Sequence, residues 1–142
     1  MANILVNNFK LIAMDASAGI DWLVDTIKIS LHTSTLTPNP DTHTYFSDLT
    51  NEVTGTGYTA GGATLATKTL TQDNTLDRGV ADAADTTWAT STITARYAVG
   101  YKSTGTPSTS PVIGIIDFGA DKSSSATDFV IQYNASGIIY LG

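Results

Sequence analysis

The glycine-rich segment 55–62 is the first part of the chain whose residue types could support chemistry. It reads Gly-Thr-Gly-Tyr-Thr-Ala-Gly-Gly, and loops of this kind can bind phosphate through backbone N–H groups. A phosphate loop ends in Gly-Lys-Ser/Thr or leads into a helix, whereas a threonine-rich strand pattern follows here and Lys68 is the next basic residue. This context favours structural turns over a nucleotide site.

Two histidines are the next candidates for chemistry. His32 and His43 are eleven residues apart, one on the polar side of a predicted strand and one at the edge of a predicted loop. A metal pair is an alternative with little support from spacing, and surface imidazoles, solvated or hydrogen-bonded, are favoured. The chain has no Gly-x-Ser-x-Gly motif, so a serine hydrolase is not expected.

The acidic segment 73–79 offers oxygen ligands that could bind Ca²⁺. Its sequence, Asp-Asn-Thr-Leu-Asp-Arg-Gly, departs from the Asp-x-Asp-x-Asp-Gly pattern and lacks the later glutamate. Asx turns, in which side-chain oxygens accept local backbone N–H groups, are therefore the favoured interpretation.

Aromatic side chains could form a sugar-binding platform or anchor a protein interface. Most of them lie at alternating positions of predicted strands, and burial in the core already explains that spacing. A carbohydrate-binding role stays open as an alternative. The candidate protein-interface residues are Phe9, Trp22, Tyr58 and Trp88.

Charge and composition narrow the classes of partner. The 142 residues carry a net charge of −6, which disfavours binding to a phosphate backbone, and only 14% of them are charged. No cysteine is present, so disulfides and thiolate sites are excluded. No apolar run is long enough to span a membrane. We expect no enzyme activity, no cofactor, no metal, no nucleic-acid partner and no membrane partner.

The first half of the chain predicts one helix and two strands. Apolar residues at helical spacing predict a short helix over residues 8–18, with Asn7 or Asn8 as N-cap and Gly19 as stop. Period-two alternation predicts strands over residues 25–32 and 63–71.

The second half predicts two hairpins. Residues 92–102 are expected to form the longest strand and to pair with 111–119 across a long loop. A turn is expected at 121–126, and strand 127–134 is then expected to pair with 138–141. The predicted fold class is mostly β: one antiparallel β-sandwich or jelly-roll-like domain over residues 1–142, with residues 1–21 as an N-terminal arm or helix.

Two segments carry a resemblance to a known group of proteins. They read Glu-Val-Thr-Gly-Thr-Gly-Tyr-Thr-Ala-Gly-Gly-Ala-Thr-Leu over 52–65 and Ser-Thr-Ile-Thr-Ala-Arg-Tyr-Ala-Val over 91–99. With residues 25–34, the Ile-Asp-Phe-Gly of 116–119 and the closing segment, most of the chain resembles small structural proteins of tailed bacteriophage virions.

The resemblance implies a capsid decoration, or cement, protein. Such a protein would be made in the host cytoplasm and would bind the outer surface of the shell. Its partners would be the major capsid protein and further copies of itself, in a homotrimer. A head-fibre, neck or tail component is the first alternative, and a receptor- or carbohydrate-binding module is the second.

Overall fold

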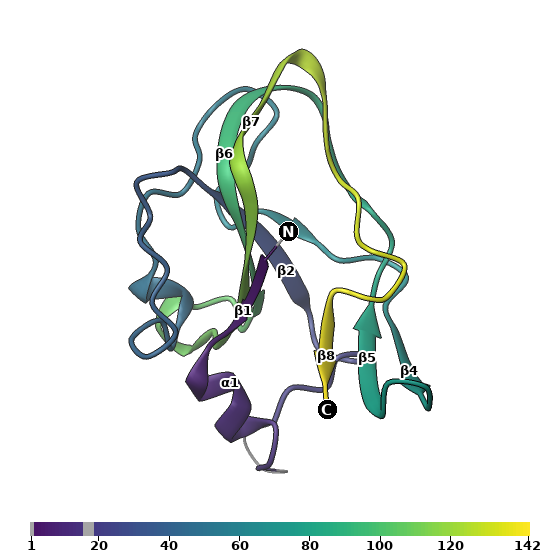
Figure 1. The fold of residues 1–142 in the computed structure, drawn as a ribbon. Helices are drawn as coiled ribbons and strands as arrows, with labels where there is room; N and C mark the ends of the chain where they lie inside the picture. The colour runs from purple at the N-terminus through teal and green to yellow at the C-terminus, as the bar shows by residue number, and fades with distance from the viewer. Residues whose placement is uncertain (1, 16–18) are drawn as a thin grey trace.

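Two antiparallel β-sheets and a short N-terminal helix form the computed structural model, which describes residues 2–15 and 19–142 (Figure 1). The strand order is β1-β7-β6-β2-β3 in the larger sheet and β4-β5-β8 in the smaller. This architecture confirms the predicted mostly-β class with two antiparallel sheets. The elements are β1 (Ala2–Leu5), α1 (Asn7–Ile12), β2 (Ile27–His32), β3 (Ala63–Thr64), β4 (Thr69–Asp73), β5 (Arg78–Asp82), β6 (Thr86–Lys102), β7 (Val112–Ile131) and β8 (Ile139–Leu141), with 3₁₀ turns at Phe46–Asp48 and Pro107–Thr109.

Strand β2 lies inside the larger sheet, between β6 and β3. Its alternating Ile27, Ile29 and Leu31 are buried, as the sequence predicts. Ser30 and His32, on the opposite face, are buried as well. The expectation that this face is polar and solvated is therefore wrong: segment 50–53 lies along β2, where Val53 donates to the Leu31 carbonyl and the Thr50 carbonyl lies 2.8 Å from His32 Nδ1.

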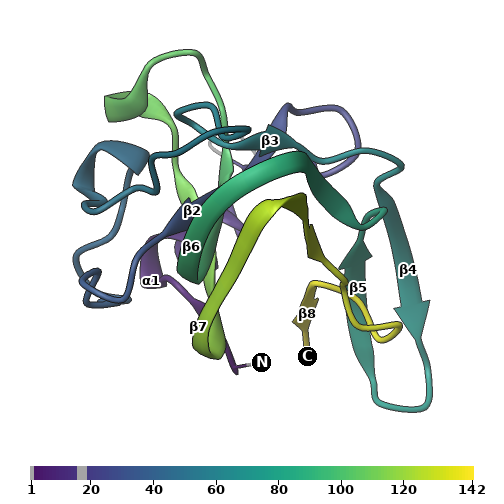
Figure 2. The same ribbon diagram turned by 90° about the horizontal axis from the view of Figure 1, so that it is seen from above.

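Strands β6 and β7 form one long antiparallel ribbon, which arches over the molecule in Figure 2. The predicted pairing of 92–102 with 111–119 is confirmed by the Val99–Ile115 register. Two details of the prediction for these strands are wrong. The longest strand is β7, with 20 residues against 17 for β6, and residues 121–126 belong to β7 rather than to a turn. Small polar residues suggest a turn there, but residues 122–124 pair with 93–95 of β6 and remain part of the strand.

The smaller sheet consists of β4, β5 and β8, which lie to one side of the ribbon (Figure 2). The predicted strand 63–71 is divided between the two sheets, because Thr67 has a left-handed backbone with φ of 50° that changes the direction of the chain. Segment 138–141 pairs with β5 and not with 127–134, so the predicted second hairpin is wrong. Strand β5 was not predicted.

The N-terminal segment lies on the body of the protein. Strand β1, also not predicted, pairs with β7 from Ala2–Asp117 to Leu5–Gly114. Helix α1 begins after Val6, which replaces Asn7 or Asn8 as N-cap, and it ends at Ile12. The remainder of the predicted helix includes residues 16–18, which are outside the described part of the chain. Residues 2–12 therefore do not form a projecting arm.

The core is built on the ribbon and β2, which are neighbours in the larger sheet, together with the segments that cover them. It includes the most fully buried large side chains of the described residues. These are Ile27, Ile29, Leu31, Leu36, Ile113 and Ile115.

Candidate interaction surface

The four predicted interface residues do not form one exposed face. Phe9, Trp22 and Trp88 are buried in the core cluster, and Tyr58 is half-buried against it. Trp88 contacts Phe129 edge-on at 6.0 Å between ring centroids, within the ribbon. The structure brings the four together as two separate pairs: Phe9 and Trp22 line one groove, and the Tyr58 and Trp88 rings lie 6.0 Å apart between centroids.

A buried serine–histidine pair lies on β2. Ser30 Oγ is 3.0 Å from His32 Nε2, and His32 Nδ1 is 2.8 Å from the Thr50 carbonyl oxygen. Because a carbonyl only accepts, Nδ1 donates, and Nε2 accepts the Ser30 hydroxyl proton. Burial lowers the pKa of His32, which keeps the imidazole neutral. Ser30 and His32 are 0% and 1% exposed, so no substrate reaches this pair as it stands.

Glu52 and Tyr58 fasten the glycine-rich segment to β2. The Tyr58 hydroxyl donates to Glu52 Oε1 at 2.7 Å and accepts from the Leu31 backbone N–H at 2.9 Å. Glu52 Oε1 also accepts the Gly61 N–H at 2.6 Å. Desolvation raises the pKa of Tyr58, so the hydroxyl stays protonated as a donor.

The glycine-rich segment serves packing rather than phosphate binding in this arrangement. Gly62 has a φ of 75°, and a Cβ at this position would overlap the Ile29 carbonyl. The segment therefore passes directly over β2 only because this residue has no side chain. The Gly61 carbonyl accepts the Tyr101 hydroxyl at 2.7 Å, and burial raises the pKa of Tyr101 to about 12.

His43 lies apart from the Ser30–His32 pair and is also buried. Its Nδ1 lies 3.4 Å from the Asn39 backbone N–H, and desolvation lowers its pKa. Both histidines are hydrogen-bonded, but neither is the surface imidazole that the sequence suggested. Across residues 2–15 and 19–142, no three His, Asp or Glu side chains are grouped so that they could hold a metal ion.

The acidic segment 73–79 forms the turn between β4 and β5. Asp73 Oδ1 accepts the N–H groups of Thr75 and Leu76 at 3.1 and 3.2 Å, which is an Asx turn as predicted. Asp73 Oδ2 pairs with Arg78 at 3.1 Å. These hydrogen bonds and the ion pair lower the pKa of Asp73.

The ribbon presents an exposed surface rich in hydroxyl groups, which we call the ribbon surface. Several hydroxyls bond within it: Thr94 Oγ1 lies 2.7 Å from Ser123 Oγ, and Thr92 Oγ1 accepts the Ala126 N–H at 3.0 Å. Such cross-strand pairs add rigidity to an exposed ladder. The exposed hydroxyl residues of the ribbon surface are Thr87, Thr90, Thr92, Thr94, Ser123, Ser125 and Thr127, and the exposed charged residues among them are Asp121, Lys122 and Asp128.

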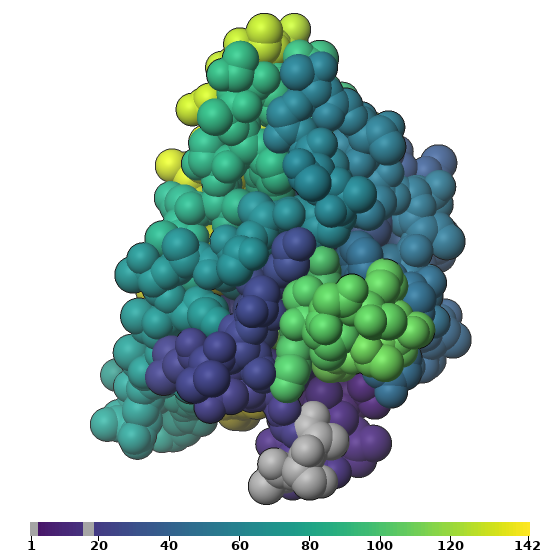
Figure 3. Space-filling view, turned by 180° about the vertical axis from the view of Figure 1, so that it is seen from behind, coloured from purple at the N-terminus to yellow at the C-terminus, as the bar shows by residue number. Residues whose placement is uncertain are grey.

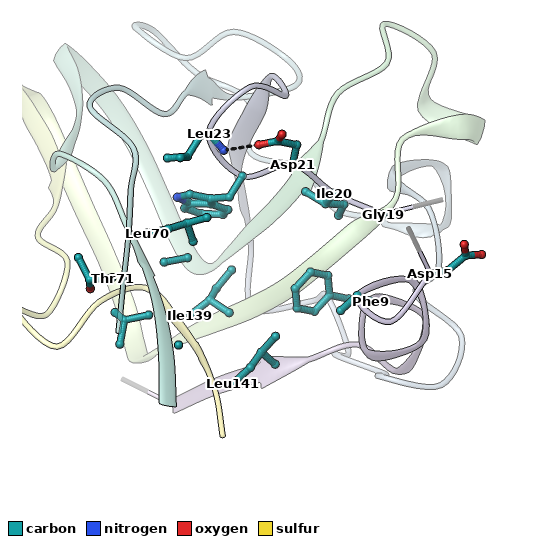
Figure 4. Close-up of a pocket in the computed structure, with 15 residues that line it drawn as sticks. Phe9, Asp15, Gly19, Ile20, Asp21, Leu23, Leu70, Thr71, Ile139 and Leu141 are labelled. Carbon is teal, nitrogen blue, oxygen red and sulfur yellow. Dashed lines mark hydrogen bonds between the residues drawn. The ribbon is translucent and has the colours of Figure 1, made fainter. Parts of the chain in front are cut away.

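An open apolar groove separates the N-terminal segment from the smaller sheet (Figure 4). Its volume is about 840 Å³. One wall carries Phe9, Ile20 and Trp22, and the other carries Leu70, Ile139 and Leu141. Among the lining residues only Asp15 and Asp21 are charged, and Asp21 Oδ1 accepts the Leu23 N–H at 3.0 Å.

Two contacts between the segment before β2 and the end of β6 were not predicted from the sequence. In the space-filling view from behind, the 103–111 loop, coloured green, lies beside the blue segment that leads into β2 (Figure 3). The Ser103 N–H donates to the Thr26 carbonyl at 2.8 Å, and Lys102 Nζ pairs with Asp25 at 2.8 Å. These long-range contacts have no local sequence signal, because each joins segments more than 75 residues apart.

Comparisons with known proteins leave the family open. No family model, no curated protein and no solved structure matches this chain. None of the helices in the described part of the chain has both the length and the apolar character that crossing a membrane requires.

Proposed function

We propose that this chain is a structural protein of a tailed-bacteriophage virion, and specifically a capsid cement protein that bridges neighbouring subunits of the shell. The observation that carries the proposal is the ribbon surface: a long, hydrogen-bonded β ribbon whose exposed side chains are mostly hydroxyl or small. Serine and threonine lose less side-chain entropy on contact than lysine or glutamate does. A surface of this composition suits adhesion to another protein.

Many copies of the protein on one shell would together give strong stabilisation even if each contact is weak. A cement protein occupies many equivalent sites, and contacts that bridge two subunits gain avidity from the linkage. A rigid ribbon supports this role, because little conformational freedom is lost on binding. In this proposal the protein acts through buried contact area and not through catalysis, and the inaccessible Ser30–His32 pair supports a non-enzymatic role.

The buried positions of the tryptophans weigh against a sugar-binding module. Stacking on a sugar ring needs an exposed aromatic face, and Trp22 and Trp88 are each 6% exposed. A head-fibre, neck or tail component has the same need for protein contacts and stays as the alternative within the virion.

Quantification of the chain in purified virions tests the proposal. A cement protein would be present in numbers that follow the shell symmetry, on the order of hundreds of copies. A few copies would instead support the neck or tail alternative, and absence from purified particles would overturn a virion role altogether.

A further inference from the structure

The free edges of the two sheets differ in how well they are protected. In the described part of the chain, the larger sheet ends in β1 and β3, which have four and two residues. The smaller sheet ends in β8, with three residues, and in β4, with five. Strand β4 is therefore the longest strand that ends a sheet, and its outer backbone groups have no strand partner.

The part of β7 beyond β1 is also unpaired on its outer side, but it carries the usual protection against pairing. Gly119 and Ala126 have left-handed backbones with φ of 80° and 51°, and the register with β6 shifts. Asp121, Lys122 and Asp128 add exposed charge. Bulges and charges of this kind prevent another strand from adding to an edge.

Strand β4 has none of these devices. Its five pairs with β5, from Thr69–Asp82 to Asp73–Arg78, follow one register without a shift. It contains no proline, and its one charged residue, Asp73, is neutralised by Arg78 at 3.1 Å. The side chain of the preceding Lys68 is held away by a hydrogen bond to the Asp25 carbonyl.

The sequence of β4 is also compatible with itself in an antiparallel arrangement. A two-fold axis at the middle residue places Thr71 opposite Thr71 of a second copy. Leu70 then lies opposite Gln72, and Thr69 opposite Asp73, so that no like charges meet. Leu70, which is 53% exposed and lines the apolar groove, becomes the diagonal neighbour of its own counterpart on the same face.

We infer that β4 pairs with β4 of a second copy across a two-fold axis, joining the two smaller sheets into one continuous sheet. Main-chain hydrogen bonds along the edge would supply affinity, and the two Leu70 side chains would cover part of each groove. The inference goes beyond the proposed function and does not depend on it. It replaces the trimer implied by the resemblance with a dimer.

Charge substitutions at the two-fold position test this pairing. Thr71 is exposed and makes no side-chain hydrogen bond among the described residues, so Thr71→Lys and Thr71→Glu should both fold. Each variant places like charges directly opposite one another and should raise the dimer dissociation constant by up to about 5-fold. A 1:1 mixture should form a dimer with one chain of each kind, measured by sedimentation equilibrium and native mass spectrometry.

Matched variants at an exposed threonine of another strand, outside the proposed interface, provide the control. Thr87→Lys and Thr87→Glu on β6 should dimerise as the unchanged protein does. The inference is overturned if the unchanged protein is monomeric at all concentrations, if the Thr71 variants keep its affinity, or if the mixture fails to restore the dimer. A trimer that is insensitive to Thr71 would overturn it as well. Because none of these measurements uses particles, their failure leaves the virion role standing.

Discussion

The two sheets of this protein differ in how far they are buried. Strand β2 of the larger sheet has five buried residues of six; Ser30 is hydrogen-bonded to His32 of the same strand, and His32 is hydrogen-bonded to the Thr50 carbonyl. Strand β4 of the smaller sheet has no buried residue. On the neighbouring β5, Asp82 has a buried Oδ1 with no hydrogen bond among the described residues.

This difference separates a rigid scaffold from a surface available for contact. Interiors packed on both faces tolerate little change, whereas a half-covered sheet contributes less to stability and has backbone groups to offer a partner. We therefore expect stability to depend on the larger sheet and association to depend on the smaller sheet and the ribbon surface.

A matched pair of leucine substitutions, one in each sheet, gives the largest expected difference in the free energy of unfolding. Leu31 on β2 is 0% exposed, so Leu31→Ala should lower the free energy of unfolding by about 2–5 kcal/mol through lost burial and a residual cavity. Leu70→Ala on the half-exposed β4 should cost less than about 1 kcal/mol. Urea denaturation of both variants measures the difference, and equal losses would contradict the proposed division between the sheets.

Removing the tyrosine hydroxyl that bonds to the larger sheet, and one that belongs to the smaller sheet, gives a smaller difference in stability. Tyr58→Phe leaves the Leu31 N–H without its acceptor and removes one of the two hydrogen bonds that Glu52 Oε1 accepts, so it should cost about 1–3 kcal/mol. Tyr140→Phe on β8 should be nearly neutral, because that hydroxyl makes no hydrogen bond among the described residues and the ring keeps its contact with Arg78 at 4.5 Å. Thermal unfolding compares the two variants. A neutral Tyr58→Phe would show that the polar network does not hold the covering segment.

The smallest expected effect is a loss of stability in mild acid. Burial lowers the folded-state pKa of His32 below 6.5, so the unfolded chain binds the proton more readily. Stability should therefore fall as the pH drops below about 6.5, above the range in which carboxylates titrate. His43 acts in the same direction. His32→Gln should flatten the decline of melting temperature between pH 7 and pH 5 more than His43→Gln does, and an unchanged slope in both would exclude the histidines as its cause.

Local pattern accounts for the parts of the fold that were predicted correctly. Alternation at Ile27, Ile29 and Leu31 identifies β2, and the oxygen-rich sequence around Asp73 identifies the Asx turn. Both signals arise within a few neighbouring residues. The same reasoning fails for residues 121–126, where small polar side chains suit either a turn or an exposed strand, and only the pairing with β6 decides between them.

Non-local contacts explain the errors in the site. His32 was expected at the surface because it alternates with apolar residues, but segment 50–53, about twenty residues later, covers it. Phe9 and Trp22 share the apolar groove with Leu70 and Ile139, which come from distant parts of the chain. No spacing within one segment reports that the smaller sheet would lie opposite the N-terminal segment.

Hydrogen exchange on the free chain and on the same chain bound to virions tests the proposed adhesion role most directly. Amides of β2 should exchange slowly in both states, because that strand is already buried. Amides along the outer edge of β7, at residues 119–131, should exchange more slowly only in the bound state, where the ribbon surface meets the shell. If binding leaves these amides unchanged, or if the chain does not bind particles, the ribbon surface is not the contact with the shell.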